Sequence, residues 1–439
     1  MTAPHILFLN RSYWPDTEAT GQLLTELTTD LSQWFDVTVI AGRPNHVDQD
    51  ANPDSGLADD YRGVTVRRVW HSRFSKYSSL GRLINLATFT LAAWRAARRL
   101  SRQPDVIVVQ SDPFFLPLIG RRLQLRYGNC PLVCYLQDLY PDVAVAVGKV
   151  REGWLTQTIR KLLFNVYRHS QKVVVLSTDM RQRCKEYGVP TETVEVVSNW
   201  ADTNDVRPIK SNNAFRRQHG LEDRFIVMYS GNMGLAHDLD TLLDAANLLR
   251  DREDLEWVFV GDGARRESAI HRAEQLGLSR IRFLPYQPRS FLTHSLSAAD
   301  VHLVSVRPRT TACVMPSKFY GILASGTPSV AVVDPETELS ELINKHEVGF
   351  TCVPGDAQSL AERIRELADN AELKDRLGNN SRRLAESEFS RSRQTARMAE
   401  LLCRVLGRDL PESLGLQLSI ADENSESSRD VDQTMPLSP

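Results

Sequence analysis

Short, continuous apolar runs alternate with longer stretches of helical periodicity along the first half of the chain. The runs are HILFLN (5–10), DVTVIAG (36–42), VTVRRVW (64–70), DVIVVQS (105–111), PLVCYLQ (131–137) and KVVVLS (172–177). Between them the pattern predicts helices over 20–34 and 80–102. Because the runs are rich in Val, Ile and Leu and lack polar alternation, they indicate parallel strands buried on both faces. This is typical of a doubly wound α/β domain.

A second series of the same kind begins near residue 224. Its runs are RFIVMYSG (224–231), LEWVFVGDG (255–263), IRFLPY (281–286), ADVHLVSV (299–306), SVAVV (329–333) and GFTCV (349–353). A polar segment rich in Asn and Asp separates the two series and indicates a linker. Two doubly wound, Rossmann-like domains joined once would place the carboxyl edges of their strands on either side of a central cleft, where ligands bind in open α/β sheets.

These patterns divide the chain into five parts. We expect an N-terminal domain over 1–200, a linker over 201–215 and a C-terminal domain over 216–390. A helix over 391–410 follows, and one option is that this helix packs back against the N-terminal domain. The acidic, Ser-rich end, 411–439, is predicted to be disordered.

Composition narrows the class of protein. The 439 residues are 42% hydrophobic and 25% charged, with a net charge of −2, which is ordinary for a globular chain and argues against a general nucleic-acid binder. The six cysteines form no C-x-x-C pair, so we expect buried thiols in a reducing, cytoplasmic setting. The N-terminus shows no signal region. The longest apolar run, 83–94, has 12 residues against the roughly 20 that span a bilayer.

Glycine-containing turns follow three of the predicted strands. NRSYWPDTEATGQLL contains a single glycine, Gly21, and lacks the G-x-G-x-x-G pattern, which disfavours a nicotinamide or flavin dehydrogenase. YSGNMGLAHDLDTLLDAA contains Gly231 and Gly234, and VGDGARRES contains Gly261 and Gly263. Such turns allow a phosphate to approach the backbone closely, but each is equally a tight strand-to-helix turn.

The segment VMPSKFYGILASGTPSVAV, 314–332, predicts a helix that begins near Pro316 and ends before Gly326. A strand-to-helix turn of this kind suits an anion. No carboxylate occurs between Arg309 and Val333, and Lys318 is the one charged side chain in that stretch.

The order of these motifs resembles the retaining, GT-B-fold glycosyltransferases of family 4, the glycosyl transferases group 1. The resemblance covers about 5–408, and QDLYPDVAVAVG with PSKFYGIL is similar to the subgroup of fucosyl- and N-acetylfucosaminyltransferases of surface polysaccharide synthesis. It implies a nucleoside diphosphate sugar, UDP- or GDP-linked, as substrate, with no cofactor and no metal. The implied donor-binding residues are Gly21, Gly231, Asn232, Gly234, Gly261, Gly263, Pro285 and Tyr286.

The chain departs from that family's pattern at four positions. Asn232 and His237 stand where an arginine and a lysine are usual, and Cys313 and Gly321 stand where two glutamates are usual. A diphosphate leaving group still needs cations. We therefore expect Lys318, with the backbone N–H groups around Ser317, to neutralise the charge that develops on it; a solvated helix residue is the alternative.

Three carboxylates are further candidates. Asp138 ends a predicted strand and could accept the proton of an acceptor hydroxyl or stabilise an oxocarbenium-like transition state, or it could be a turn residue. Glu338 and Glu341 could bind donor hydroxyls or the ribose, and are equally explained as acidic residues at a helix start.

Two basic amphipathic stretches bear on the acceptor. LGRLINLATFTLAAWRAARRLSR and GWLTQTIRKLLFNVYRHSQK combine apolar residues, Trp and cations, which suits an anionic membrane surface and equally suits helices covering a sheet. Membrane contact fits a glycan or lipid-linked sugar acceptor at the inner face of the cell membrane. A soluble acceptor, an epimerase, and a nucleotide-sugar-binding protein without transferase activity stay open as alternatives.

Overall fold

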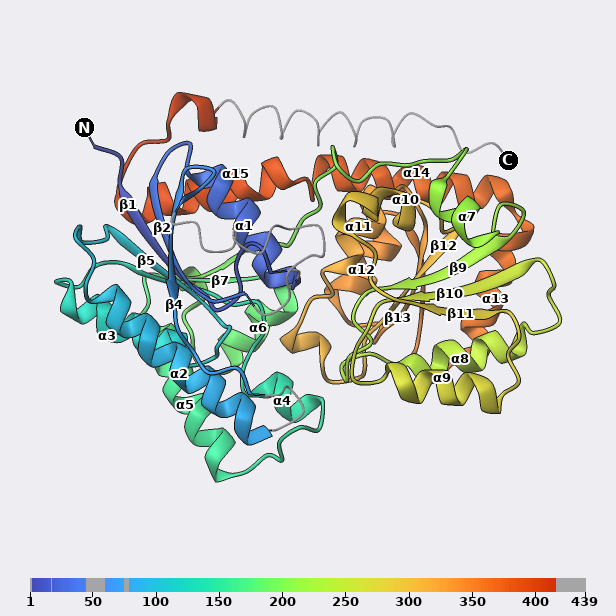
Figure 1. The fold of residues 1–439 in the computed structure, drawn as a ribbon, viewed down its shortest axis with the longest axis horizontal. Helices are drawn as coiled ribbons and strands as arrows, with labels where there is room; N and C mark the ends of the chain where they lie inside the picture. Colours follow the sequence, from blue (N-terminus) through green and yellow to red (C-terminus); the bar gives the residue numbers. More distant parts are fainter. Residues whose placement is uncertain (1, 17, 45–59, 75–78, 416–439) are drawn as a thin grey trace. The chain divides into compact units, whose positions relative to one another are not determined.

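The computed structural model describes residues 2–16, 18–44, 60–74 and 79–415. The chain divides into two compact units, the first made of residues 1–198 and 392–420 and the second of residues 199–391. Each is an α/β unit whose sheet has helices on both faces (Figure 1).

The first unit contains a sheet in which the strands follow the order β3-β4-β2-β1-β5-β6-β7-β8. All neighbours pair in parallel except β3 with β4. The strands are β1 (His5–Leu9), β2 (Asp36–Gly42), β3 (Asp60–Tyr61), β4 (Val64–Val69), β5 (Val106–Gln110), β6 (Leu132–Tyr135), β7 (Lys172–Val175) and β8 (Val194–Val196). The helices are α1 (Ala19–Leu31), α2 (Ser79–Ala97), α3 (Leu116–Arg126), α4 (Asp142–Ala146), α5 (Trp154–Arg168), α6 (Thr178–Glu186) and α15 (Arg391–Leu406).

The second unit contains a parallel sheet with the order β11-β10-β9-β12-β13-β14. The strands are β9 (Phe225–Ser230), β10 (Leu255–Val260), β11 (Ile281–Leu284), β12 (Val301–Ser305), β13 (Ser329–Val332) and β14 (Gly349–Cys352). The helices are α7 (Ala214–His219), α8 (Leu239–Leu248), α9 (Arg266–Gln275), α10 (Leu292–Leu296), α11 (Lys318–Ala324), α12 (Glu338–Lys345), α13 (Ala357–Asp369) and α14 (Ala371–Ser387).

Burial on both faces explains the continuous apolar runs. In β9, Val227 and Tyr229 belong to one hydrophobic cluster, while Ile226 and Met228 belong to another. Since successive side chains of a strand point to opposite faces, both faces of this sheet are covered. The prediction of two doubly wound domains is confirmed.

Several element boundaries differ from the sequence prediction. The helix predicted over 80–102 ends at Ala97, and α11 begins at Lys318, two residues after the predicted start. The short strands β3 and β8 were not predicted. The segment 201–215 lies in the second unit, where Asn213 caps α7 by accepting from the backbone N–H of Phe215.

The end of α15 is bound to the first unit. Arg404 Nη1 lies 3.2 Å from Glu195 Oε1, and Trp34 Nε1 donates to Ser413 Oγ at 3.0 Å. Of the segment predicted to be disordered, residues 416–439 lie outside the described residues.

Two further expectations concern cysteines and membrane spans. All six cysteines are buried, as predicted. Over the described ranges, no helix combines the length and the hydropathy that a membrane span requires.

Candidate active site

In the second unit, the strand order reverses at β9, which has β10 on one side and β12 on the other. In open α/β sheets, the crevice outside the carboxyl ends of the strands at such a point is where ligands bind. The turn after β9 carries Gly231, Asn232 and Gly234. His237 connects this turn to β12, because its Nδ1 donates to the backbone oxygen of Ser305 at 2.6 Å.

Lys318, the first residue of α11, extends its side chain to this turn. Its Nζ lies 3.5 Å from the centroid of the Tyr229 ring, and a Cβ placed on Gly231 would lie 3.3 Å from the same Nζ. The residue as a whole is half-buried, yet Nζ is shielded from solvent and makes no hydrogen bond or ion pair within the described part of the chain. Burial lowers the pKa of Lys318 well below its ordinary value of 10.5.

The histidine beside Lys318 is neutral. Burial, and next the charge of Lys318, lowers the pKa of His237 to about 3. The carbonyl of Ser305 can only accept, so Nδ1 carries the proton in the neutral ring. Asn232 and His237 stand where the family that the motifs resemble has basic residues, but they add no positive charge here. Lys318 and Arg265, whose Nη1 donates to the backbone oxygen of His237 at 3.1 Å, each bring a cation to this turn.

Two of the predicted donor-binding glycines are required by backbone packing. A Cβ on Gly261 would lie 2.1 Å from the backbone oxygen of Gly231, and one on Gly263 would lie 2.5 Å from the backbone carbon of Met233. Gly231, Gly261 and Gly263 also have φ values of 137°, 136° and 149°. The turns after β9 and β10 thus pack against each other through glycines, whatever else they bind.

The other donor-binding candidates lie at the carboxyl ends of further strands in this unit. Pro285 and Tyr286 follow β11; both are exposed, and the Tyr286 ring lies against the Gly261 turn. Ser317 precedes α11. Glu338 and Glu341 lie in the first turn of α12, where Thr337 caps the helix through the N–H of Ser340.

The two positions that lack the family's usual glutamates differ in surroundings. Cys313 is fully buried. Gly321 lies in α11, and a Cβ there would meet the flexible end of Leu296 at 3.3 Å. Neither position supplies a charge.

In the first unit the strand order reverses at β1, between β2 and β5. Arg11 follows β1 and Asp112 follows β5; their Nη2 and Oδ2 atoms lie 3.0 Å apart. Arg11 also lies 3.2 Å from Glu18, whose carboxylate accepts from Ser12 Oγ at 2.5 Å. Sequence reasoning did not select Arg11, Asp112 and Glu18, although the first two directly follow strand ends.

Asp138 lies beside this cluster, after β6. The backbone N–H groups of Gln137 and Asp138 donate to Ser111 Oγ at 3.0 and 3.2 Å. Burial, and next the carboxylate of Asp112, raises the pKa of Asp138 from 3.8 to about 6. Gly21, at the start of α1, packs on the turn after β1, where a Cβ would lie 3.2 Å from Ser12.

Two family models match the chain, one on each unit. The glycosyl transferase 4-like domain matches residues 20–200, and glycosyl transferases group 1 matches residues 211–384. The chain is a family 4 glycosyltransferase. The turn after β9 and the helix that carries Lys318 fall within the group 1 match. Asp112 falls within the other match, and Arg11 precedes it.

Two curated relatives are similar over most of this glycosyltransferase. A protein of Escherichia coli (strain K12) that carries the name colanic acid biosynthesis glycosyl transferase WcaI is 27% identical over 380 residues, which is 82% of this chain and 91% of its own length. LpsD of Rhizobium meliloti (strain 1021), a lipopolysaccharide core biosynthesis glycosyltransferase, is 26% identical over 347 residues, 78% of this chain and 88% of its own.

Solved structures support the same fold. The crystal structure of Anabaena HepE in complex with UDP and glucose has a TM-score of 0.69 and 19% identity, and the match covers 91% of this chain and all of HepE. This likeness assigns the glycosyltransferase to the GT-B fold.

Among the residues described, no group of three or more His, Cys, Asp or Glu side chains could hold a metal ion.

Proposed function

We propose that this glycosyltransferase moves a sugar, a hexose or a hexose derivative, from a UDP- or GDP-linked donor to a glycan or lipid-linked acceptor in cell-surface polysaccharide synthesis. The names of the similar proteins, which refer to colanic acid and to the lipopolysaccharide core, favour this class of product. HepE, which shares the fold, was crystallised with UDP and glucose. The subgroup of fucosyl- and N-acetylfucosaminyltransferases stays our preferred assignment for the transferred sugar, on the motifs QDLYPDVAVAVG and PSKFYGIL.

One observation carries the donor proposal: within the described ranges, the buried Nζ of Lys318 has no hydrogen-bond partner. A buried ammonium group without a counter-ion is unfavourable, so its position is best explained by an anion that binds next to it. The glycine turn after β9 lies beside Nζ, at the strand-order reversal where ligands bind in such sheets. A donor diphosphate combines the charge and the size that this turn suits.

Leaving-group stabilisation then needs no metal. As the bond between the sugar's anomeric carbon and the diphosphate oxygen breaks, Lys318 and the N–H groups around Ser317 neutralise the charge on the diphosphate. The acceptor oxygen forms the new bond, and Asp138, ionised above its pKa of about 6, accepts the hydroxyl proton. Retention at the anomeric carbon follows the family that the motifs resemble.

The acceptor side favours a membrane surface. The α2 helix exposes Leu80, Leu83 and Leu91, and α5 exposes Trp154 and Leu155. Exposed apolar side chains on cation-bearing helices suit the interface of an anionic bilayer. We therefore propose a peripheral protein at the cytoplasmic face of the cell membrane.

A thermal-shift panel of UDP-, GDP- and dTDP-sugars tests the donor proposal. A ligand that binds the folded state raises the melting temperature by mass action, so the correct nucleotide should stand out in the wild type and not in Lys318→Met. Release of nucleotide from the bound donor supports transfer. Tight binding without release would instead indicate a silent nucleotide-sugar-binding protein, and interconversion of the donor sugar an epimerase.

A further inference from the structure

The outward side of α5 exposes large apolar side chains among cations. Trp154, Leu155 and Leu162 are 79%, 52% and 51% exposed. Trp154 and Leu155 are adjacent, and Leu162 follows two turns later on the same side of the helix. Arg151 and Lys161 are exposed next to them. The opposite side of α5, with Leu163, Phe164 and Tyr167, packs into the core. We call the five exposed residues the outer face of α5.

Charge favours a lipid surface as the occupant of this face. Its two charged members are both cationic, and the nearby acid Glu152 is already paired with Arg160. A Trp side chain flanked by Leu and cations is the composition that binds at the boundary of headgroups and acyl chains, with anionic lipids adding the electrostatic part.

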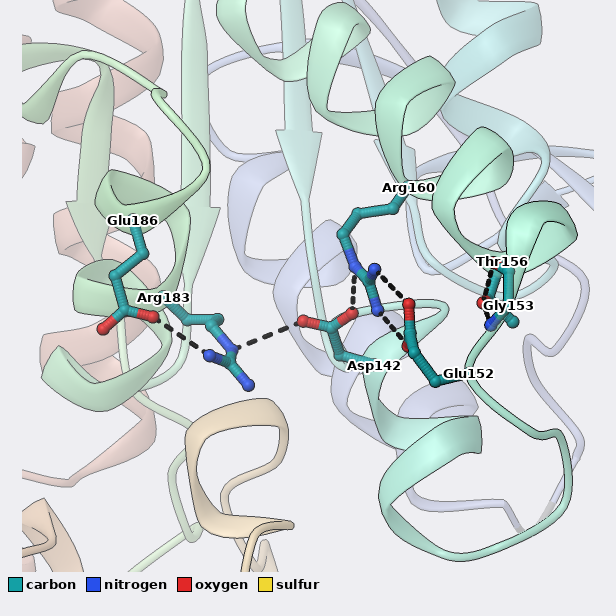
Figure 2. Close-up of polar contacts among 7 residues, drawn as sticks. All are labelled: Asp142, Glu152, Gly153, Thr156, Arg160, Arg183 and Glu186. Carbon is teal, nitrogen blue, oxygen red and sulfur yellow. Dashed lines mark hydrogen bonds and ion pairs between the residues drawn. The ribbon is translucent and has the colours of Figure 1, made fainter.

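A chain of ion pairs leads inward from this face. Arg160 contacts Glu152 with two nitrogens, Nη1 to Oε1 at 2.8 Å and Nη2 to Oε2 at 2.9 Å, and its Nε donates to Asp142 Oδ1 at 2.6 Å (Figure 2). The Glu152 contact and, after it, Asp142 raise the pKa of Arg160. Paired, forked contacts of this kind fix geometry more strongly than a point charge does.

The inner end of the chain of ion pairs is close to Asp138. Asp142 begins α4 and is buried, four residues after Asp138. The N–H of Val143 donates to the backbone oxygen of Leu139 at 2.9 Å, and Leu139 is fully buried. Holding Asp142 therefore holds the turn that carries Asp138.

We propose that the outer face of α5 rests on an anionic lipid surface and that Arg160 is a positioning residue, which holds the Asp138 turn in place when the lipid surface fixes the segment around Glu152. This rests on the proposed function, since it assigns Asp138 to catalysis and the acceptor to a membrane. A surface-bound segment opens less often, and the Glu152–Arg160–Asp142 contacts pass that restraint to residues 137–143.

The structure offers a matched control for the coupling. Arg183 also contacts Asp142, with Nε 3.3 Å from Oδ2, and pairs with Glu186 at 3.0 Å (Figure 2). Arg160 and Arg183 both lie over the Tyr187 ring, at 5.3 and 5.5 Å. Glu186 ends α6 and is no part of the outer face of α5. Glu152→Gln and Glu186→Gln therefore remove equivalent surface charges, but only the first cuts the connection to that face.

Vesicle binding and hydrogen exchange test the proposal on the full chain. We expect the protein to float with vesicles that contain phosphatidylglycerol but not with vesicles of pure phosphatidylcholine. Flotation should be lost in the double variant Trp154→Ser, Leu155→Ser. It should be kept in the control Leu248→Ser, which changes an exposed leucine of α8. Bound vesicles should slow exchange at residues 137–143 in the wild type and in Glu186→Gln. Glu152→Gln should bind the vesicles equally well, but exchange at residues 137–143 should not slow.

Three results would overturn the proposal: flotation that is unchanged in the double variant, no slowing of exchange at residues 137–143 in the wild type, or equal slowing of exchange in Glu152→Gln. Dimerisation through the outer face of α5, visible as a loss of dimer in the double variant without any vesicle binding, would also overturn it. Nucleotide-dependent thermal shifts are independent of these measurements. An overturned coupling with intact nucleotide binding would leave the transferase proposal standing.

Discussion

Lys318 Nζ lies 3.5 Å from the centroid of the Tyr229 ring, and within the described residues no carboxylate pairs with it. The ring face partly compensates the buried charge, because the negative face of an aromatic ring attracts a cation. Compensation by one ring is incomplete, since burial still lowers the pKa of Lys318 well below 10.5. The same side chain therefore opposes folding in the free protein and favours binding of an anion.

The first prediction concerns the stability of the free protein. Because the pKa of Lys318 is lower in the folded state, the unfolded state binds more protons between the lowered pKa and 10.5, and stability rises with pH in that window. The slope is at most ~1.4 kcal/mol per pH unit for one proton. Urea unfolding over pH should show this slope in the wild type and not in Lys318→Met. An identical slope in both proteins would mean that Lys318 keeps its ordinary pKa.

The second prediction concerns proton uptake with the nucleotide. A bound diphosphate raises the pKa of Lys318, so binding should take up a proton and affinity should fall as pH rises above the pKa of the free site. His237 and His302, with pKa values of about 3 and 4, stay neutral and cannot supply this effect. Calorimetry of the stabilising nucleotide in buffers of different ionisation enthalpy measures the uptake. Absence of uptake in the wild type, or its persistence in Lys318→Met, would exclude Lys318 as the group that protonates.

The residues around Lys318 show what the sequence could and could not predict. Apolar runs predicted both sheets, because a strand buried on two faces must be apolar at every position. Strand ends pointed to Gly231 and Asp138, since ligand-binding residues follow the carboxyl ends of parallel strands. The Tyr229 ring under Lys318 was not predicted, because a side-chain contact between β9 and α11 leaves no periodic signal in the sequence.

The same limit applies to the first unit. Arg11 and Asp112 are 101 positions apart, and their contact exists only because β1 and β5 are neighbours in the sheet. The strand order cannot be read from apolar runs alone. The short strands β3 and β8 were missed for a different reason, since two or three residues are too few to show a period.

The third prediction tests whether Gly261 is needed for the packing of the two glycine turns, apart from any contact with a ligand. Gly261→Ala would place a Cβ 2.1 Å from the Gly231 oxygen at a φ of 136°, so the two turns must move apart. We expect a loss of about 3 kcal/mol or more in the free energy of unfolding. Gly277→Ala is the control, because its φ of 66° is also positive but no atom lies within 4 Å of the new Cβ; it should cost about 1 kcal/mol. Equal losses in the two variants would contradict the packing role.

The last prediction concerns Asp138, whose pKa burial and the Asp112 carboxylate raise to about 6. As a general base it must be ionised, so turnover should rise with pH through a midpoint near 6. Asp138→Asn should lower kcat by about 10²–10⁴-fold.

Asp112→Asn removes a neighbouring negative charge and leaves Arg11 unopposed on that side, so the midpoint should move to lower pH. Asp105→Asn, an exposed carboxylate before β5, is the matched control and should leave the midpoint in place. The pH dependence of kcat/KM, which reports groups of the free enzyme, is measured for all four proteins with the donor that the thermal-shift panel selects and its acceptor. A midpoint unchanged in Asp112→Asn would mean that another group sets the profile.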